Sequence, residues 1–369
     1  MALTRRKTLG LIGGGTILAA TATAGTFLAT RTPHKALAPW DMAGTYVDAR
    51  MNALSFALLA PNPHNRQPWL AELRGQNTVQ IYRDKARDLP VTDPYGRQLT
   101  IGMGCFLELM DMAAAQMNIA VETVLFPQGE DGPVAECIFK PNASQPDPLF
   151  AYVMERRSHK EAFEDRKIPN TAVQPLKPYA HIATDLAEVE TLKRIAQTAW
   201  LAEAATPDAW QESVDLLRIG KAEINAQPDG IDIGGPMMDS LAAVGLFTRE
   251  AAADVNNAGS QGAIQDTVDA ITSAHGFVVQ ISAQNTREDQ IAAGRDWLRL
   301  NLATTAAGLK LRPVSQALQE YEAVSDPYTE IHKLYAPGGE TVQMLGLLGY
   351  GTDVPRTPRW PLETKMLNA

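Results

Sequence analysis

The sequence contains only two cysteines in 369 residues, Cys105 and Cys137, and both lie in apolar stretches. So few cysteines exclude a disulfide scaffold, and both are expected to be small buried hydrophobic residues. Whether the two pair with each other stays open at this point. The six histidines and two cysteines show no spacing typical of metal ligands, so no metal site is expected. A G-x-S-x-G nucleophile motif is also absent.

An excess of positive charge is missing as well. The chain has 42 acidic residues against 33 Lys and Arg, which gives a formal net charge of −9. Binding nucleic acid requires a basic face that releases counterions, so nucleic acid is not expected as a partner. The remaining composition, 45% hydrophobic and 20% charged, is that of a globular chain with one large or two ordinary domains.

The chain also lacks a strong hydrophobic run, because its most apolar stretch, up to about Leu28, is interrupted by glycines and threonines. Such a stretch makes a poor permanent membrane span. It follows the TRRKTL segment at 4–9 and contains a cleavage-like ATA at 22–24. Residues 1–30 are therefore predicted to be a twin-arginine export signal, with the twin-arginine translocase as partner and a periplasmic or otherwise exported location. The alternatives are an ordinary apolar helix after two arginines, or an uncleaved anchor.

The first half of the chain is expected to alternate helices and strands. Apolar residues at helical spacing and runs rich in β-branched residues carry this prediction. The expected helices lie at about 42–60 and 98–116, and the expected strands at about 70–74, 78–83, 121–126 and 134–139. The Pro- and Asp-rich stretch PNASQPDP at 141–148 is the natural seam after them.

The second half is expected to repeat this plan loosely. Its Gly294-Arg295 pair is predicted to precede an amphipathic helix, as Gly96-Arg97 does in the first half. The other expected elements are an opening helix that carries ERRSHKEAF at 155–163, a helix at 186–205, and strands at 277–282 and 340–351. Residues 206–262 are rich in Gly, Asn and Asp and form either a packed connection or a lid over a site.

Two segments, PNPHNRQPW at 61–69 and ERRSHKEAF at 155–163, together resemble motifs of the nitroreductase family of FMN-dependent oxidoreductases. In that family the basic segment comes first, and each FMN takes one segment from each subunit of a dimer. Here the order is reversed, so the chain resembles two fused subunits, as in the fused, Acg-like branch. The resemblance implies an α+β fold with a mixed, mainly antiparallel sheet and surrounding helices. It also implies a monomer, duplicated internally as a pseudo-dimer with halves at 42–145 and 146–369.

The resemblance further implies which residues would bind FMN. Arg156 and Ser158 of the basic segment and Arg359 of TPRWPL would bind the phosphate. Lys160 would reach the ribityl chain and ring, and the other two segments would lie beside the flavin. The implied residues are Arg156, Ser158, Lys160, Pro61, Asn62, Pro63, Asn65, Gln67, Pro313, Ser315, Gln316 and Arg359. Asn62 and Pro63 depart from the family pattern, which has Ser or another small residue there, and Pro63 lacks a backbone donor.

Each of these residues also has a plainer interpretation. A Glu-Arg-Arg cluster alone would be a solvated charge run, and only its pairing with the first segment favours a phosphate site. Trp69 is expected to be core packing, given the area an indole buries. His64 is expected to be a hydrogen-bonding loop residue, although a histidine, which titrates near neutral pH, could also relay protons.

The expected function is that of an oxidoreductase. Hydride from a reduced small-molecule donor would reach the flavin N5, and electrons would pass to a small acceptor such as a nitroaromatic or a quinone in a ping-pong cycle. The flavin carries the redox chemistry, so no catalytic side chain is expected. The alternative is an FMN-holding protein with little turnover, because residues 206–262 cover the flavin. The sequence identifies neither the donor nor the acceptor.

Overall fold

The computed structural model describes residues 31–141 and 144–368. The predicted export signal at 1–30 lies outside the described residues. Among the described residues, none of the helices combines the length and the apolar character needed to cross a membrane.

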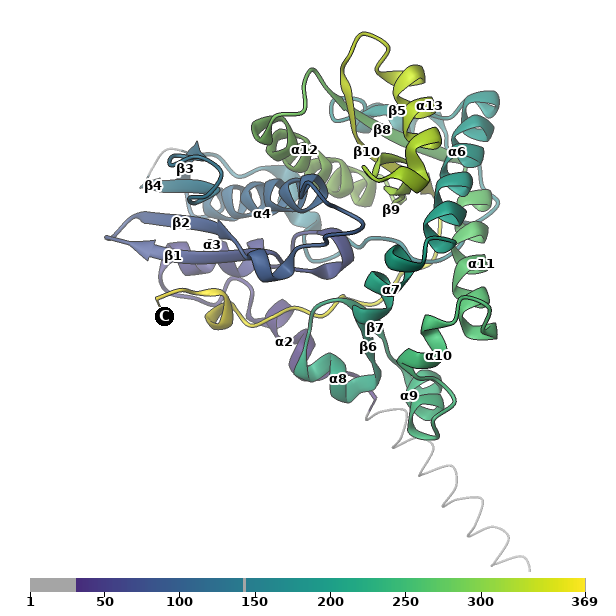
Figure 1. The fold of residues 1–369 in the computed structure, drawn as a ribbon. Coiled ribbons are helices and arrows are strands. Elements are labelled where there is room, and N and C mark those ends of the chain that lie inside the picture. The colour runs from purple at the N-terminus through teal and green to yellow at the C-terminus, as the bar shows by residue number, and fades with distance from the viewer. Residues whose placement is uncertain (1–30, 142–143, 369) are drawn as a thin grey trace, which may run out of the picture.

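The first half of the chain forms an antiparallel sheet with helices on it (Figure 1). The strands lie in the order β1-β2-β4-β3, and every neighbouring pair is antiparallel. They are β1 (Trp69–Arg74), β2 (Thr78–Arg83), β3 (Ile119–Leu125) and β4 (Ala135–Pro141). The helices are α2 (His34–Met42), α3 (Ala49–Ala57) and α4 (Arg97–Ala115). Alternate residues of β2 are buried, as expected for a strand with one face on the core.

The helix expected from about 42 to 60 was wrong in its bounds, because within that segment only α3 is helical after Met42. α2 ends at Met42, and Gly44 then adopts a φ of +81°. α3 starts anew with Asp48 as its N-cap, whose side chain accepts a hydrogen bond from the backbone of Arg50. A left-handed glycine followed by a capping aspartate ends one helix and begins another.

The second half forms another antiparallel sheet, in the order β5-β8-β10-β9. Its strands are β5 (His181–Ala183), β8 (Gly276–Ser282), β9 (Lys310–Pro313) and β10 (Thr341–Gly349). Its helices are α5 (Asn170–Val173), α6 (Leu186–Ala204), α11 (Ala258–Ser273), α12 (Arg287–Ala306) and α13 (Ser325–Tyr335). Together with the first half, this arrangement confirms the predicted α+β class and the mainly antiparallel pairing.

Two further predictions in this half were wrong. Residues 155–163 form no helix. Ser158 instead pairs with Leu311 in an isolated parallel bridge, so this segment runs alongside β9. Gly294 does not precede a helix but lies inside α12, which begins with a capping box between Thr286 and Asp289. The capping signal lay in the sequence, whereas pairing with a strand 150 residues away has no local signal.

Residues 206–262, called the insert below, connect α6 to α11. They contain α7 (Pro207–Asp215), β6 (Leu217–Ile219), α8 (Gly220–Ala226), β7 (Ile231–Ile233), α9 (Pro236–Ala243), α10 (Arg249–Ala253) and the start of α11. β6 and β7 form a two-stranded parallel sheet. In Figure 1 the insert lies below both four-stranded sheets.

The two halves meet where α4 crosses α12. A Cβ built on Gly294 would lie 2.8 Å from the Cα of Gly104 and closer still to the carbonyl oxygen of Ile101. The helices therefore touch backbone to backbone, which only glycines allow. Beside the crossing, the buried Glu108 of α4 accepts hydrogen bonds from Arg295 (2.7 Å) and Arg299 (2.5 Å) of α12.

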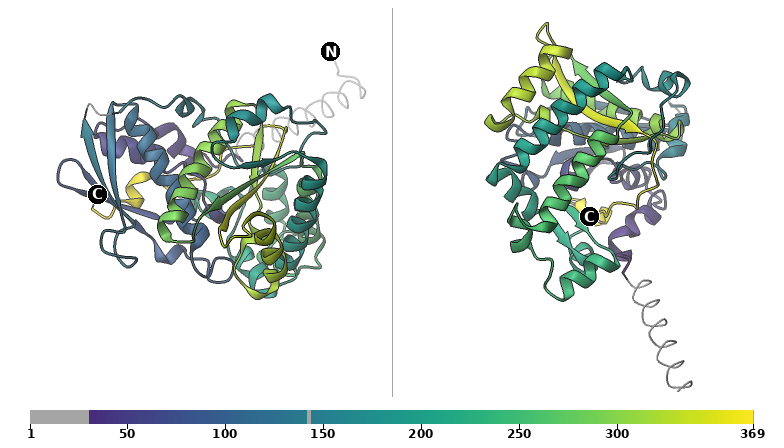
Figure 2. Two further views of the ribbon diagram at one scale, coloured as in Figure 1. Left: turned by 90° about the horizontal axis from the view of Figure 1, so that it is seen from above. Right: turned by 90° about the vertical axis from the view of Figure 1, so that its right-hand side faces the viewer.

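The C-terminal segment returns from β10 to the first half. In Figures 1 and 2 it ends beside the first sheet, where the backbone of Leu367 donates to the carbonyl oxygen of Ala71 over 2.8 Å. On the way, Arg359 donates through its backbone to Ala36. This path brings a residue near the C-terminus beside the loop that precedes β1.

Candidate FMN site

Two adjoining cavities bring together most of the predicted site residues. The first, called the arginine cavity, has a volume of about 160 Å³, and the second, called the ring cavity, about 250 Å³. Both are lined by Pro61, Asn62, His64 and Ser158. The arginine cavity adds the predicted residues Asn65, Arg156, Lys160 and Arg359, and the ring cavity adds Pro63, Pro313 and Ser315.

Gln67 and Gln316 are the two predicted site residues that line neither cavity. Gln67 is fully buried; its Nε2 donates to the carbonyl of Pro228, and its Oε1 accepts from the backbone of Trp360. Gln316 begins the short 3₁₀ helix η5 (Gln316–Leu318), directly after Ser315. Gln67 therefore joins the loop to the insert and to the C-terminal segment. It holds the loop in position and does not line a cavity.

The loop before β1 carries an unusual backbone. His64, Asn65 and Gln67 all have positive φ angles, of 46°, 50° and 50°. Such conformations cost about 1–3 kcal/mol each and persist only where the surroundings impose them. Here Asn62 Oδ1 accepts from the Gln67 backbone (2.7 Å), and the buried Lys365 donates to the Gln67 carbonyl (2.9 Å). The loop is therefore held rigidly at the mouth of both cavities.

Two buried arginines form one wall of the arginine cavity. Arg156 and Arg359 are each 3% exposed. Arg156 donates to the carbonyl of Leu59 (2.9 Å), and Arg359 donates to the carbonyls of Leu58 (2.7 Å) and Ala60 (3.1 Å) and to Asn65 Oδ1 (2.6 Å). The Nη1 of Arg156 is buried without a hydrogen-bond partner. Within residues 31–141 and 144–368, no ion pair is formed by either side chain.

Neither guanidinium group forms an ion pair with a described residue, and the charge of Asp232 offsets that of Arg359 only in part. Burial, and then the charge of Arg157, lowers the pKa of Arg156 to about 10; burial, and then the charge of Arg156, lowers that of Arg359 to about 9. Both groups therefore remain charged at neutral pH. Buried like charges with an unused donor are suited to an anion, and a guanidinium suits phosphate geometry best.

Two further cations lie at the edge of the arginine cavity. Arg157 lies over the ring of Trp40, 4.7 Å from its centroid, and donates to the carbonyls of Met154 and Arg156. The exposed Lys160 forms a 2.8 Å ion pair with Asp232 of the insert. Gly230 and Ile231 line the cavity beside Asp232. The insert thus contributes a carboxylate to a cavity that is otherwise lined by cations.

The ring cavity is the larger of the two and mainly apolar. A Cβ on Gly102 would lie 3.1 Å from the Cβ of Asn62 and 3.2 Å from the Cδ of Pro63, so the loop packs closely against α4 at this glycine. Its remaining walls come from α4, α12 and β10: Gln98, Ile101, Cys105, Trp297 and Met344. An apolar slot with a few amide and hydroxyl groups is suited to a flat heteroaromatic ring. Sequence reasoning did not assign these residues to the site; among them, Cys105 was expected only to be a buried hydrophobic residue.

The two cysteines are both buried and unpaired. Cys105 donates its Sγ hydrogen to the carbonyl of Gly294 over 3.1 Å, and burial raises its thiol pKa to about 12. It is therefore a neutral wall of the ring cavity, as expected for a small hydrophobic residue.

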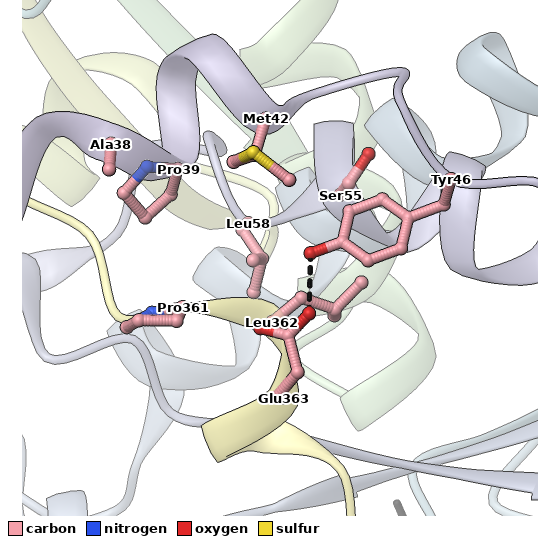
Figure 3. A pocket seen from close by; sticks show the side chains of 9 residues that line it. All are labelled: Ala38, Pro39, Met42, Tyr46, Ser55, Leu58, Pro361, Leu362 and Glu363. Atoms are coloured by element: carbon pink, nitrogen blue, oxygen red, sulfur yellow. Dashed lines mark hydrogen bonds between the residues drawn. The ribbon is translucent and has the colours of Figure 1, made fainter.

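A third hollow lies between α2, α3 and the C-terminal segment (Figure 3). It has a volume of about 100 Å³ and is mainly apolar. Its polar pair is already satisfied, because the hydroxyl of Tyr46 donates to Glu363 over 2.8 Å. No cation lines it, so it offers nothing for a phosphate.

Comparisons with known proteins give partial likenesses. No protein-family model matches the chain. It is 35% identical over 86 residues to the putative NAD(P)H nitroreductase acg of Mycobacterium tuberculosis, covering 23% of this chain and 25% of that protein. An uncharacterized protein of the same organism is 35% identical over 80 residues, 21% of this chain and 23% of its own length. The chain thus spans about a quarter of the length of the curated relatives it matches.

Solved structures overlap with the chain only loosely. The FMN-dependent nitroreductase NfnB of Mycobacterium smegmatis, solved with NADPH, matches with a TM-score of 0.38 and 18% identity over 58% of this chain and 96% of its own. A nitroreductase-like protein of Bacillus cereus matches with a TM-score of 0.34 and 12% identity over 60% of this chain and 96% of its own. The fold assignment therefore rests on the strand order above. In sequence, the chain is similar over about a quarter of its length to a protein named as a nitroreductase, the family that its two motifs resemble.

Proposed function

We propose that this protein is an FMN-dependent oxidoreductase of the nitroreductase type. The observation that carries the proposal is the pair of buried arginines, Arg156 and Arg359, whose positive charge meets carbonyl and amide oxygens but no carboxylate. The mainly apolar ring cavity adjoins them. A phosphate at one end and a flat ring at the other are the two parts of FMN that a protein must hold.

The residues of the cavities fit that group. Arg156, Arg359 and Ser158 would hold the phosphate, with the partner-free Nη1 of Arg156 as one donor. Asn62 and Asn65 would face the ribityl chain, and the ring cavity would take the flavin ring. FMN supplies hydride transfer at its N5 when bound. The chain's own residues bind it, orient it and exclude water.

We also propose that the chain consists of two nitroreductase-like halves, at 42–145 and 146–369, that make one FMN site in a monomer. One half supplies the loop at 61–67, and the other supplies Arg156, Ser158 and Arg359. The proposal includes export by the twin-arginine pathway, a periplasmic location, and small-molecule electron donors and acceptors. The acidic composition and the absence of a basic motif support partners other than nucleic acid.

The experiment that tests this proposal is extraction and quantification of flavin from natively exported protein. We expect one FMN per chain, since each half carries only one part of the site. Two flavins per chain, or FAD in place of FMN, would contradict the fused half-site. Retention of residues 1–30 in the exported protein, measured by mass spectrometry, would identify an anchor rather than a cleaved signal.

One observation favours a second candidate, an FMN-holding protein with little turnover. Gly230, Ile231 and Asp232 of the insert line the arginine cavity, and Pro228 is bonded to Gln67. A closed insert would keep a donor from approaching N5 within about 3–3.5 Å, the distance that hydride transfer requires.

Anaerobic reduction separates the two candidates. NADPH, NADH and dithionite would each be mixed with the wild type and with a loosened Asp229→Ala/Asp232→Ala variant, and flavin bleaching followed. Deletion of the insert is less suitable because it would expose the strained loop. Rapid bleaching of the wild type by a nicotinamide supports the oxidoreductase. Bleaching by a nicotinamide only in the loosened variant supports the holder.

A further inference from the structure

A buried carboxylate lies where the insert, the first half and the C-terminal segment meet. Asp229 of the insert is 3% exposed. Its carboxylate forms ion pairs with Arg218 of the insert (2.7 Å) and with Arg87 of the first half. It also accepts a hydrogen bond from the indole Nε1 of Trp360 (3.0 Å), whose ring lies 5.7 Å from the guanidinium of Arg87. One side chain therefore holds three parts of the chain together.

The residues on either side of Asp229 bond the loop before β1. The carbonyl of Pro228 accepts a hydrogen bond from Gln67 Nε2 (2.6 Å), and the backbone N–H of Gly230 donates to the carbonyl of Asn65 (3.2 Å). Gly230 has a φ of +74°, and a Cβ on it would collide with a backbone oxygen of the insert. The turn after Asp229 is thus closely packed and requires a glycine.

These contacts converge on the arginine cavity. Gly230, directly after Asp229, lines this cavity together with Asn65. Arg359, directly before Trp360, also lines it and donates to Asn65 Oδ1 over 2.6 Å. Gly230, Asn65 and Arg359 line the arginine cavity and not the ring cavity, and Asp229 lines neither. Asp229 is therefore one residue along the chain from the cavity wall on two sides, and it does not reach the ligand.

We propose that Asp229 is a positioning residue of the FMN site, which orders the wall of the arginine cavity that faces the phosphate. The proposal rests on the proposed function. The carboxylate fixes Trp360 on one side and the turn at Gly230 on the other, so Arg359 and Asn65 keep their places before the ligand arrives. A site whose ligand-facing groups must first be ordered binds more weakly, because the ordering costs conformational entropy.

The negative charge of Asp229 is essential to this role. Arg218 is 8% exposed, and its other acceptors are the carbonyls of Asp215 and Leu217. Without the carboxylate, the guanidinium groups of Arg218 and Arg87 would face each other with no shared counter-charge. A buried charge that loses its partner is strongly destabilising. The contact between the insert and the first half would therefore loosen beside the arginine cavity.

The test compares FMN with riboflavin, which lacks the phosphate. Both are titrated by flavin fluorescence into cofactor-free wild type, Asp229→Asn and Glu223→Gln. We expect Asp229→Asn to bind FMN about tenfold more weakly and riboflavin within about twofold of the wild type, because a residue that orients ligand-binding side chains is lost. Glu223→Gln breaks the ion pair with Arg249 inside the insert, so it is the matched control and should bind both flavins like the wild type.

A second measurement needs no flavin. The Nε of Arg359 donates to the carbonyl of Leu58 over 2.7 Å. Exchange of this Nε proton with solvent is followed by NMR, and the signal is assigned by its loss in Arg359→Ala. We expect faster exchange in Asp229→Asn than in the wild type and in Glu223→Gln. Equal exchange in the wild type and Asp229→Asn overturns the proposal, and so do equal losses of FMN and riboflavin affinity, which indicate a general loosening.

A third variant covers the case in which Asp229→Asn does not fold. Trp360→Phe keeps both ion pairs of Asp229 and removes the indole hydrogen bond. It must then weaken FMN binding by about threefold, as expected for one hydrogen bond, with riboflavin binding unchanged. Unchanged FMN binding in Trp360→Phe would overturn the proposal. Failure of the wild type to bind FMN would defeat the proposed function, while exchange of the Arg359 proton would still decide whether Asp229 orders the cavity wall.

Discussion

The contact between the two halves and the contact of the insert with the cavity loop are built in opposite ways. α4 and α12 touch through the backbones of Gly104 and Gly294, with a buried carboxylate clamped by two arginines beside them. The insert reaches the loop through single hydrogen bonds, such as Gly230 to the carbonyl of Asn65, and through the half-exposed pair of Lys160 and Asp232. Exposed pairs are worth about 0–1 kcal/mol.

This difference indicates which part can move. Close packing over a helix crossing cannot be separated without opening the core, so the halves form one permanent body. The insert leaves Met237, Val244 and Leu246 exposed and keeps several of its ion pairs within itself, including those of Arg218 with Asp229 and Arg249 with Glu223. Its links to the first half are the ion pair of Asp229 with Arg87 and the hydrogen bonds that Glu212 accepts from Val91 and Thr92. These links would have to break before the insert could move as a lid.

The largest effect is expected at the helix crossing. Gly294→Val would place side-chain atoms inside the contact with Ile101 and Gly104, where only backbone can be displaced. We expect a loss of at least about 4 kcal/mol in the free energy of unfolding, or failure to fold. Urea unfolding measures it. A loss below about 1 kcal/mol would show that the halves are less tightly joined than the coordinates indicate.

Gly262→Ala is the matched control in α11, at the insert's end. Nothing lies within 4 Å of a Cβ at Gly262, and its φ is not positive. Alanine in an exposed helix position should stabilise by about 0.5–1 kcal/mol relative to glycine. Replacement of a glycine by a larger residue is thus expected to lower the free energy of unfolding at the helix crossing and to raise it in the exposed part of α11.

The second prediction compares the two buried arginines of the arginine cavity, Arg156 and Arg359, with Arg157 at its edge. Arg156→Ala and Arg359→Ala should each weaken FMN affinity by about 2–4 kcal/mol, since both guanidinium groups are fixed by carbonyls of residues 58–60 and face the anion. Arg157→Ala should cost much less, because its Nη1 donates to the carbonyls of Met154 and Arg156. Titration by flavin fluorescence measures all three. Equal and negligible losses of FMN affinity in all three variants would show that these arginines are a solvated charge cluster and not a phosphate site.

The structure brings ten of the twelve predicted site residues together at the two cavities, and the sequence signals behind them differ. Arg156, Ser158 and Arg359 were predicted together only through the family resemblance, because no local pattern links residues 200 positions apart. Most strands and long helices followed from periodicity. The positive φ of His64 was not predicted, because only a few per cent of non-glycine residues adopt a positive φ, even though histidine is enriched among them. Neither was the role of Asp232, since its place at the cavity depends on how the insert packs.

The third prediction concerns Glu203 at the root of the insert. Burial raises its pKa from 4.5 to about 7, so the folded protein binds more protons than the unfolded chain between those values, and stability falls as pH rises through them. Glu203→Gln removes that loss. We expect the variant to exceed the wild type by up to about 3 kcal/mol at pH 8 and to match it near pH 4.5, at about 1.4 kcal/mol per pKa unit. Urea unfolding at both pH values checks it; a gain independent of pH would contradict it.

The smallest effect tests whether the insert competes with the ligand. Asp232 lines the cavity that Arg156 and Arg359 also line, and it forms an ion pair with Lys160. Asp232→Asn would remove a negative charge facing a dianionic phosphate and free Lys160 for it, so FMN affinity should rise by about 0.5–1 kcal/mol, less at high salt. Asp208→Asn, on the exposed start of α7, is the control for charge alone and should change nothing. If Asp232→Asn instead weakens FMN binding, Asp232 helps to hold FMN. The insert would then be part of the FMN site rather than a lid that competes with the ligand.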